Sequence, residues 1–288
     1  MYKIESKNVI TPQNGLNIYV GRTEDSITLT EVRDGDPMDI GIKTDAPQQL
    51  AMAIRTRRSP GVIMMGNLGD PYCEYEEEHR LTRECLKVIE NYDHGVIIST
   101  RRSGIRRDID ILSSMARKTK CVIDIPFPTL YEKVIRKLDG EGTMTVDERI
   151  DLIRELRKNN IDVMVTVQPI IPFVNTEEQD ILDMVQLLDG CDILGIDLMG
   201  MRTALPKATR EFFFTEFEKR FPEEFRLYSE EKHKDTELVP AGHRKLLARV
   251  EEACQDYGIM CDTKRIRAWK RQYENKQVGV QMSLSDFI

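Results

Sequence analysis

Two aspartates in apolar segments are the residues with the clearest capacity for chemistry. Asp124 lies within segment 121–125, and Asp197 lies within segment 192–198. Carboxylates from two strands of one parallel sheet can bind a divalent metal ion that activates water or polarises a substrate. One interpretation is therefore a metal-dependent lyase or hydrolase that uses Asp124 and Asp197, although the sequence does not show that the two side chains converge.

A loop with two glycines follows segment 61–66. It begins at Gly66 and Asn67, contains Gly69 and Asp70, and ends at Tyr72. Glycines allow backbone N–H groups to approach a bound ligand closely. The same pattern is typical of an ordinary turn between a strand and a helix, so the loop alone does not establish a binding site.

Four arginines lie immediately before a predicted helix, at positions 101, 102, 106 and 107, next to Ser99, Thr100 and Ser103. Positive charge is unfavourable at a helix N-terminus. The run therefore favours a site for an anion more than most basic runs do. A solvated group of charges is the alternative interpretation.

The cysteines and histidines do not form a metal-binding motif. The six cysteines have no C-x-x-C spacing, and the four histidines lack the spacing of metal ligands. Cys121 and Cys191 are expected in the core, and Cys73 is the one thiol expected to face a pocket. The single tryptophan, Trp269, lies among five cations; it could stack on a nucleic-acid base, but an exposed helix with an anchoring aromatic is favoured.

The elements that would position these residues follow a β–α alternation. Apolar runs rich in β-branched residues predict buried strands at 61–66, 95–100, 121–125, 161–170 and 192–198, with a further strand near 16–20. Amphipathic segments predict helices at 46–57, 79–92, 106–119, 146–159 and 177–188. Helices at 207–220 and 243–257 follow. The order predicts a parallel sheet of about six strands with helices outside it and working residues at the strand C-termini.

The overall composition limits the class of protein. The chain has 288 residues, of which 40% are hydrophobic and 32% charged, with a net charge of −7. This charge argues against a general nucleic-acid binder, because phosphate contacts require a basic surface. No run approaches the roughly 18 apolar residues of a membrane span, so a cytoplasmic protein with no membrane partner is expected.

In chain order, several short motifs resemble the radical S-adenosylmethionine (SAM) enzymes of the spore photoproduct lyase-like group. The motifs are Asn17-Ile18-Tyr19-Val20-Gly21, Lys43-Thr44-Asp45-Ala46-Pro47, Asp70-Pro71-Tyr72, Arg107-Asp108-Ile109-Asp110, Pro169-Ile170-Ile171-Pro172 and Tyr273-Glu274-Asn275-Lys276-Gln277. The resemblance implies a partial (β/α)6 TIM-like barrel over residues 1–204, with a C-terminal helical extension over 205–288. It also implies a small-molecule ligand, SAM, across the strand ends. The residues expected to bind this cofactor are Tyr19, Gly66, Asn67, Asp70, Tyr72, Ser99, Arg101, Ser103 and Gln168.

The sequence departs from the group at the position of its metal cluster. The group binds a [4Fe–4S] cluster through C-x-x-x-C-x-x-C just after the first strand, and the reduced cluster splits SAM to a radical. Here Gly21 runs directly into Arg22, and no cysteine precedes Cys73. Either the chain is a divergent copy that has lost the cluster, or this sequence lacks a short segment of the natural protein.

Three functions therefore remain open from the sequence. The first is a radical SAM-like protein that is inactive as written, and the second is a non-catalytic barrel that binds a ligand or partner. The third is the metal-dependent enzyme that uses Asp124 and Asp197. A nucleic-acid partner would rest on analogy with the group alone.

Overall fold

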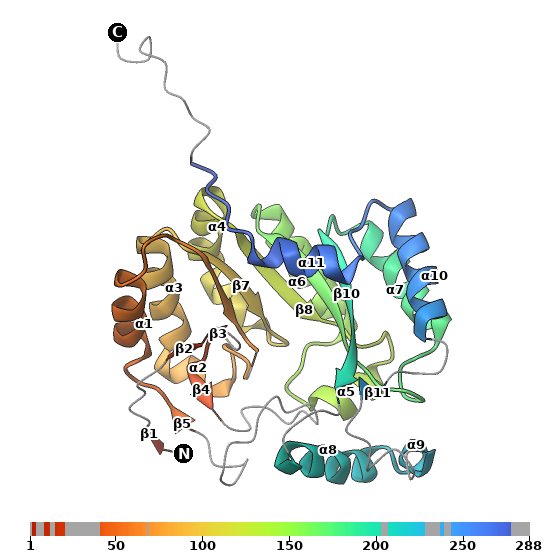
Figure 1. Ribbon diagram of the computed structural model, residues 1–288. Coiled ribbons are helices and arrows are strands. Elements are labelled where there is room, and N and C mark those ends of the chain that lie inside the picture. The colour runs from red at the N-terminus through yellow and green to blue at the C-terminus, as the bar shows by residue number, and fades with distance from the viewer. Residues whose placement is uncertain are drawn as a thin grey trace.

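The computed structural model describes residues 2–3, 9–11, 15–20, 41–67, 69–202, 207–227, 237–238 and 243–277. Six parallel strands form the middle of an open sheet: β3 (Gly15–Leu16), β6 (Val62–Met65), β7 (Gly95–Ser99), β8 (Cys121–Pro126), β9 (Asp162–Ile170) and β10 (Gly195–Arg202). Short antiparallel strands flank them, β2 (Ile10–Thr11) next to β3 and β11 (Glu237–Leu238) next to β10. The predicted parallel, unclosed barrel is confirmed (Figure 1).

The predicted first strand is wrong as a single element. Residues 15–20 form two short strands in different sheets, because β3 pairs with β6 whereas β4 (Tyr19–Val20) pairs with β5 (Gly41–Ile42). A third short strand, β1 (Tyr2–Lys3), completes the small second sheet beside β5. The position after Gly21, where the group has its cluster loop, lies outside the described residues.

The five helices predicted between the strands are present, and two short helices, at 74–79 and 132–139, are additional. They are α1 (Ala46–Arg55), α2 (Glu74–His79), α3 (Leu81–Asn91), α4 (Ile109–Lys118), α5 (Glu132–Asp139), α6 (Val146–Lys158) and α7 (Glu178–Asp189), with a 3-10 helix, η1 (Ser103–Asp108), before α4. Local signals set their ends. Thr145 and Glu148 form a reciprocal capping box at the start of α6. Arg80, with φ of 52°, separates α2 from α3.

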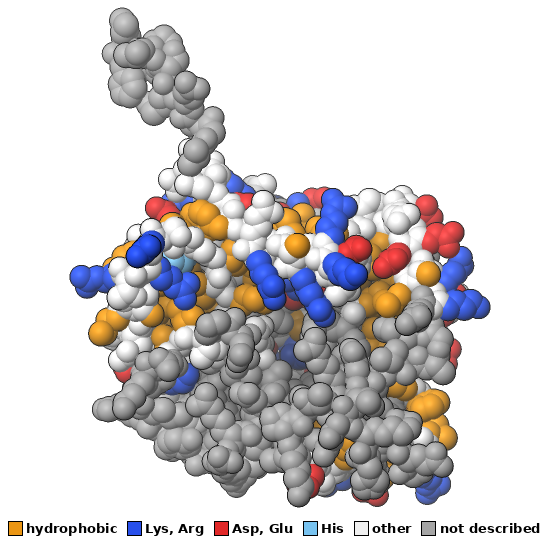
Figure 2. Space-filling view, in the orientation of Figure 1, with side chains coloured by type: hydrophobic (Ala, Val, Ile, Leu, Met, Phe, Trp, Pro, Cys, Tyr) orange, Lys and Arg blue, Asp and Glu red, His pale blue; other side chains and the backbone are white. Residues whose placement is uncertain are grey.

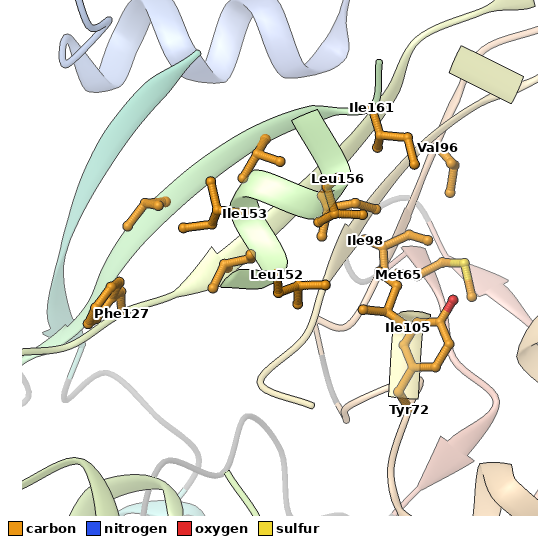
Figure 3. Close-up of a cluster of buried hydrophobic side chains, with 14 of the residues drawn as sticks. Met65, Tyr72, Val96, Ile98, Ile105, Phe127, Leu152, Ile153, Leu156 and Ile161 are labelled. Carbon is orange, nitrogen blue, oxygen red and sulfur yellow. The ribbon is translucent and has the colours of Figure 1, made fainter. Parts of the chain in front are cut away.

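The main core lies between the sheet and these outer helices. Ile98 from β7, Leu152 and Leu156 from α6, and Ile161 before β9 are all fully buried (Figure 3). Alternate residues of each parallel strand point to this side, as the period of two requires. The opposite side of the sheet is therefore the inner, concave face.

The C-terminal part of the chain contacts the barrel at three places. Helix α10 (His243–Asp256) packs on α7, and helices α8 (Lys207–Arg220) and α9 (Pro222–Leu227) form a phenylalanine cluster with Leu138 and Ile171. Helix α11 (Thr263–Arg271) lies across the inner face, in front of β8 and β10 (Figure 1). Within the described residues, no helix is both long and apolar enough to cross a membrane.

Candidate functional site

The inner face has an apolar layer and a polar layer. Ile97, Val122 and Met164 form the apolar layer under Ile266 of α11. Two residues further along the same strands, the alternation places Ser99, Asp124 and Thr166 on this face. These polar residues lie toward the strand C-termini, where active sites of α/β barrels collect.

Asp124 and Asp197 do come close together, but a lysine lies between them. The Lys270 Nζ donates to Asp124 Oδ2 at 3.0 Å and lies 3.8 Å from Asp197 Oδ2. Thr166 Oγ1 donates to the other oxygen of Asp124 at 2.6 Å, and Thr263 Oγ1 donates to Asp197 at 3.3 Å. An ammonium group thus occupies the position between the carboxylates that a metal ion would need, so the two-aspartate metal site is a wrong prediction.

The charges of Lys270, Asp124 and Asp197 depend on one another. Burial raises the pKa of Asp197, while the Lys270 ammonium lowers it and the Asp124 carboxylate raises it further. Burial alone would lower the pKa of Lys270, but Asp124 and Asp197 outweigh this effect and raise it. Lys270 is therefore protonated and acts as a counter-ion on the inner face. The sequence offered no signal for this role, because Lys270 is about 70 residues from Asp197 and its helix resembles a surface helix.

The loop after β6 is tied to the end of β7. Gly66 has φ of +93°, and a Cβ at this position would lie 2.1 Å from the Ser99 carbonyl oxygen. The glycine is therefore needed for close packing of protein backbone, a reason that the glycine pattern in the sequence does not distinguish from the approach of a ligand. Asp70 is buried and accepts hydrogen bonds from the backbone N–H of Tyr72 and Arg101 and from the Thr100 hydroxyl, at 2.7–2.8 Å. The two loops predicted to share one site are thus joined.

Two tyrosines predicted to bind the cofactor point into the protein. The Tyr19 hydroxyl donates to Glu76 Oε2 at 2.6 Å, and the Tyr72 hydroxyl donates to Asp108 Oδ2 at 3.1 Å. Both rings belong to the main core, and Figure 3 shows Tyr72 beside Ile105. Burial and the adjacent carboxylates raise the pKa of both phenols. Their hydroxyls stabilise the fold on the outer side of the sheet.

Most of the predicted basic run is held in ion pairs. Arg101 Nε donates to the buried Asp139 at 3.0 Å, Arg106 pairs with Glu155, and Arg107 pairs with Glu76 and Asp108. The fourth, Arg102, packs its guanidinium against Gly142. The positive charge near η1 is thus largely compensated by protein carboxylates, which weakens the interpretation of the run as an anion site.

Besides Gly66 and Arg101, which are half-buried, four predicted cofactor residues keep some exposure at the strand ends. Ser99 and Gln168 are half-buried on the inner face, and Asn67 is half-buried in the loop after β6. Ser103 is exposed at the start of η1. Leu68 of the same loop lies outside the described residues. The chemistry available at this edge is therefore hydroxyl and amide hydrogen bonding next to apolar surface.

The six cysteines do not converge on one site. All six lie in the described part of the chain, and all are buried with free thiols. Cys73 is fully buried in the outer core, so the prediction that it faces a pocket is wrong. Burial raises the pKa of Cys121 to about 12, which keeps this thiol protonated. Among the described residues, no three His, Cys, Asp or Glu side chains converge on a possible metal site.

A few known proteins are similar to this chain in sequence or in fold. No family model matches the sequence. Uncharacterised proteins of Mycobacterium tuberculosis and Mycobacterium bovis are each 21% identical over 200 residues, which is 69% of this chain and 58% of theirs. The chain thus spans less than two thirds of the length of these curated relatives.

The similarity to solved structures covers a larger part of the chain. A mutant of spore photoproduct lyase aligns with a TM-score of 0.61 and 14% identity, over 89% of this chain and 77% of that one. A mutant of the same enzyme with dinucleoside spore photoproduct aligns with a TM-score of 0.60 and 13% identity. The predicted resemblance in fold to the spore photoproduct lyase-like group is therefore confirmed.

Proposed function

We propose that this chain is a ligand-binding barrel of the radical SAM type that binds SAM, or a related adenosyl compound, at the C-terminal ends of its strands and carries no iron–sulfur cluster of its own. The fold shared with spore photoproduct lyase over 89% of the chain is the observation that carries this proposal. In parallel α/β folds, ligands bind at this end of the sheet.

The residue types at the strand ends suit such a ligand. Ser99 and Gln168 provide a hydroxyl and an amide on the inner face, and Met64 adds a half-buried apolar side chain on β6. An adenosyl compound combines polar atoms with an apolar ring, and pockets for such ligands combine the same two features. In this proposal Ser99, Gln168 and Asn67 hold the ligand, and Asp70 positions the two loops around it.

Cluster chemistry does not fit the residues present. Three thiolates must converge on a [4Fe–4S] cluster that leaves one iron open, whereas the six buried thiols of this chain do not converge. No reaction step is therefore assigned to a cluster. The proposed activity is binding. Lys270, Asp124 and Asp197 form a fixed group of charges beneath the proposed site.

Isothermal titration calorimetry with SAM tests the proposal. Replacing Gln168 by Ala removes one polar contact and should weaken SAM binding about 2- to 13-fold, the effect of roughly 0.5–1.5 kcal/mol. Gln179→Ala is the matched control, because Gln179 is exposed on α7, outside the barrel. Equal binding by both variants, or no binding by the parent chain, would show that the site is misassigned.

A further inference from the structure

Two of the buried cysteines lie together at the connection between α10 and α11. Cys254 continues the buried face of α10 after Leu246 and Val250, at a spacing of four residues. Cys261 lies directly before Asp262, which caps the start of α11. Both cysteine side chains belong to the main core, on the outer side of the sheet.

The backbone between the two cysteines brings their side chains to the same place. The Ile259 N–H donates to the Cys254 carbonyl at 2.8 Å, and Gly258, with φ of +69°, reverses the chain after the helix. Met260 then forms a bridge to β10 and packs against the inner apolar layer, so the alternation of a strand turns Cys261 back to the outer side. There the Cys261 thiol donates a hydrogen bond to the Cys254 sulfur.

This hydrogen bond makes the two thiols differ in acidity. The bond from Cys261 lowers the pKa of Cys254, although burial opposes the effect. The same bond, together with burial, raises the pKa of Cys261. Burial raises the pKa of three other thiols, those of Cys85, Cys121 and Cys191. Cys254 therefore has a larger fraction of thiolate, the form that reacts with oxidants, than these four cysteines.

The pair lies beneath a turn at the molecular surface. Residues 255–258 of this turn are exposed, whereas Cys254 is fully buried and Cys261 keeps 7% of its surface exposed. After the turn, α11 presents lysine and arginine side chains to solvent where it crosses the molecule (Figure 2). A local opening of the turn would admit a small oxidant while the sheet stays folded.

We infer that Cys254 and Cys261 are a reversible redox pair, which hydrogen peroxide converts to a disulfide that ties the end of α10 to the start of α11. The Cys254 thiolate attacks one oxygen of the peroxide, which breaks the O–O bond and gives a sulfenic acid and hydroxide. The Cys261 sulfur then attacks the sulfenic sulfur, forms the S–S bond and expels a second hydroxide. The two thiol protons convert both hydroxides to water. This inference does not depend on the proposed ligand site.

Thiol mapping of the full chain tests the inference, because trypsin releases both cysteines in one peptide, 250–264. The chain is treated with hydrogen peroxide, unfolded, alkylated with N-ethylmaleimide and digested without reduction. We expect peptide 250–264 to lose both alkylation sites, to weigh about 2 Da less than the reduced peptide, and to regain both sites after dithiothreitol. The other four cysteines lie in other tryptic peptides and should lose alkylation about tenfold more slowly or less.

A serine variant tests the role of each sulfur. Cys261→Ser keeps a hydrogen-bond donor beside Cys254 but cannot form the disulfide, so dimedone should trap the sulfenic acid of Cys254 in this variant and not in the parent. Cys191→Ala is the matched control, because the Cys191 thiol is bonded to Leu187 of α7 instead, and this variant should form the disulfide as the parent does.

The mapping of the parent chain decides the inference even if a variant folds poorly. A parent that keeps both alkylation sites in peptide 250–264, a loss of these sites that dithiothreitol does not reverse, or equally fast oxidation of all six cysteines would each overturn it. Absence of the dimedone label from Cys254 in a folded Cys261→Ser variant would overturn it as well.

Discussion

At the scale of single residues, Lys270 is the side chain on which the inner face depends. Its ammonium lies 3.0 Å from Asp124 and 3.8 Å from Asp197, and all three side chains are largely buried. Without this ammonium, the two buried carboxylates would repel each other, and nothing would compensate for their loss of hydration. The lysine therefore permits two acids to face the same part of the barrel.

Replacing Lys270 by Met should lower the free energy of unfolding by about 3 kcal/mol at neutral pH, since it leaves buried charges unpaired. Removing the ammonium raises the pKa of Asp197 further above its value in the unfolded chain. The folded state then binds more protons than the unfolded state, so stability decreases as pH rises through the raised pKa. Urea denaturation should show a smaller deficit at pH 5 than at pH 7.5.

The exposed Lys264 on the same helix provides the control for this prediction. Lys264→Met should change stability by no more than about 0.5 kcal/mol at either pH. A Lys270→Met variant with the stability of the parent, or with a deficit that grows toward acidic pH, would contradict the role assigned to the triad.

Gly66 shows where reasoning from the sequence reaches its limit. The pattern of glycines after a strand correctly located a loop at the edge of the sheet. It could not distinguish a ligand from protein backbone as the reason for the glycine, and the structure places the Ser99 carbonyl there. Likewise, the hydroxyls of Tyr19 and Tyr72 are bonded to Glu76 and Asp108, partners that no local pattern pairs with them.

At the scale of elements, the closing motif at 273–277 holds the C-terminal segment against the start of the strands. Tyr273 donates to the Asp93 carbonyl at 2.7 Å, Glu274 lies 3.0 Å from Lys120, and the Lys276 backbone N–H donates to the Lys118 carbonyl. Asn275 forms an isolated antiparallel bridge with Thr119. The motif therefore stabilises the docking of α11 and is distant from the strand C-termini.

Lys120 is the centre of this contact. Replacing it by Met should lower the free energy of unfolding by about 3 kcal/mol, because its buried ammonium donates to the carbonyl oxygens of Trp269, in α11, and Gln272, just after it, and pairs with Glu274. Trp269 should become more exposed, so its emission should shift to longer wavelength. Lys118→Met is the control, since Lys118 is partly exposed in its pair with Glu90. Unchanged Trp269 emission in Lys120→Met would show that α11 docks without this contact.

The elements themselves were largely predictable from the sequence. Strands β6 to β10 are mostly apolar on both faces, because helices cover one side and α11 covers part of the other. Such runs are recognisable without a structure. Helix α8 has the predicted bounds, Lys207–Arg220. The split of residues 15–20 between two sheets was not predictable, because strand pairing there depends on segments distant in sequence.

At the scale of the whole molecule, the chain has a fold similar to that of spore photoproduct lyase, but its six cysteines do not converge on one site. The open sheet of six parallel strands aligns with spore photoproduct lyase over 89% of the chain, yet its six cysteines are buried and scattered. Buried thiols with raised pKa values are poor metal ligands, since the thiolate is the form that binds iron.

The 288-residue chain should therefore fail to assemble a [4Fe–4S] cluster when iron and sulfide are supplied under anaerobic conditions. Iron analysis and visible absorption measure the cluster, and 5′-deoxyadenosine formed after reduction with SAM measures cleavage. We expect neither. Insertion of a C-x-x-x-C-x-x-C loop after Gly21 should confer both, because the resemblance in sequence predicts the cluster ligands at this position. About four irons per chain with 5′-deoxyadenosine in the unmodified protein would contradict the prediction and show that the existing thiols rearrange around the cluster.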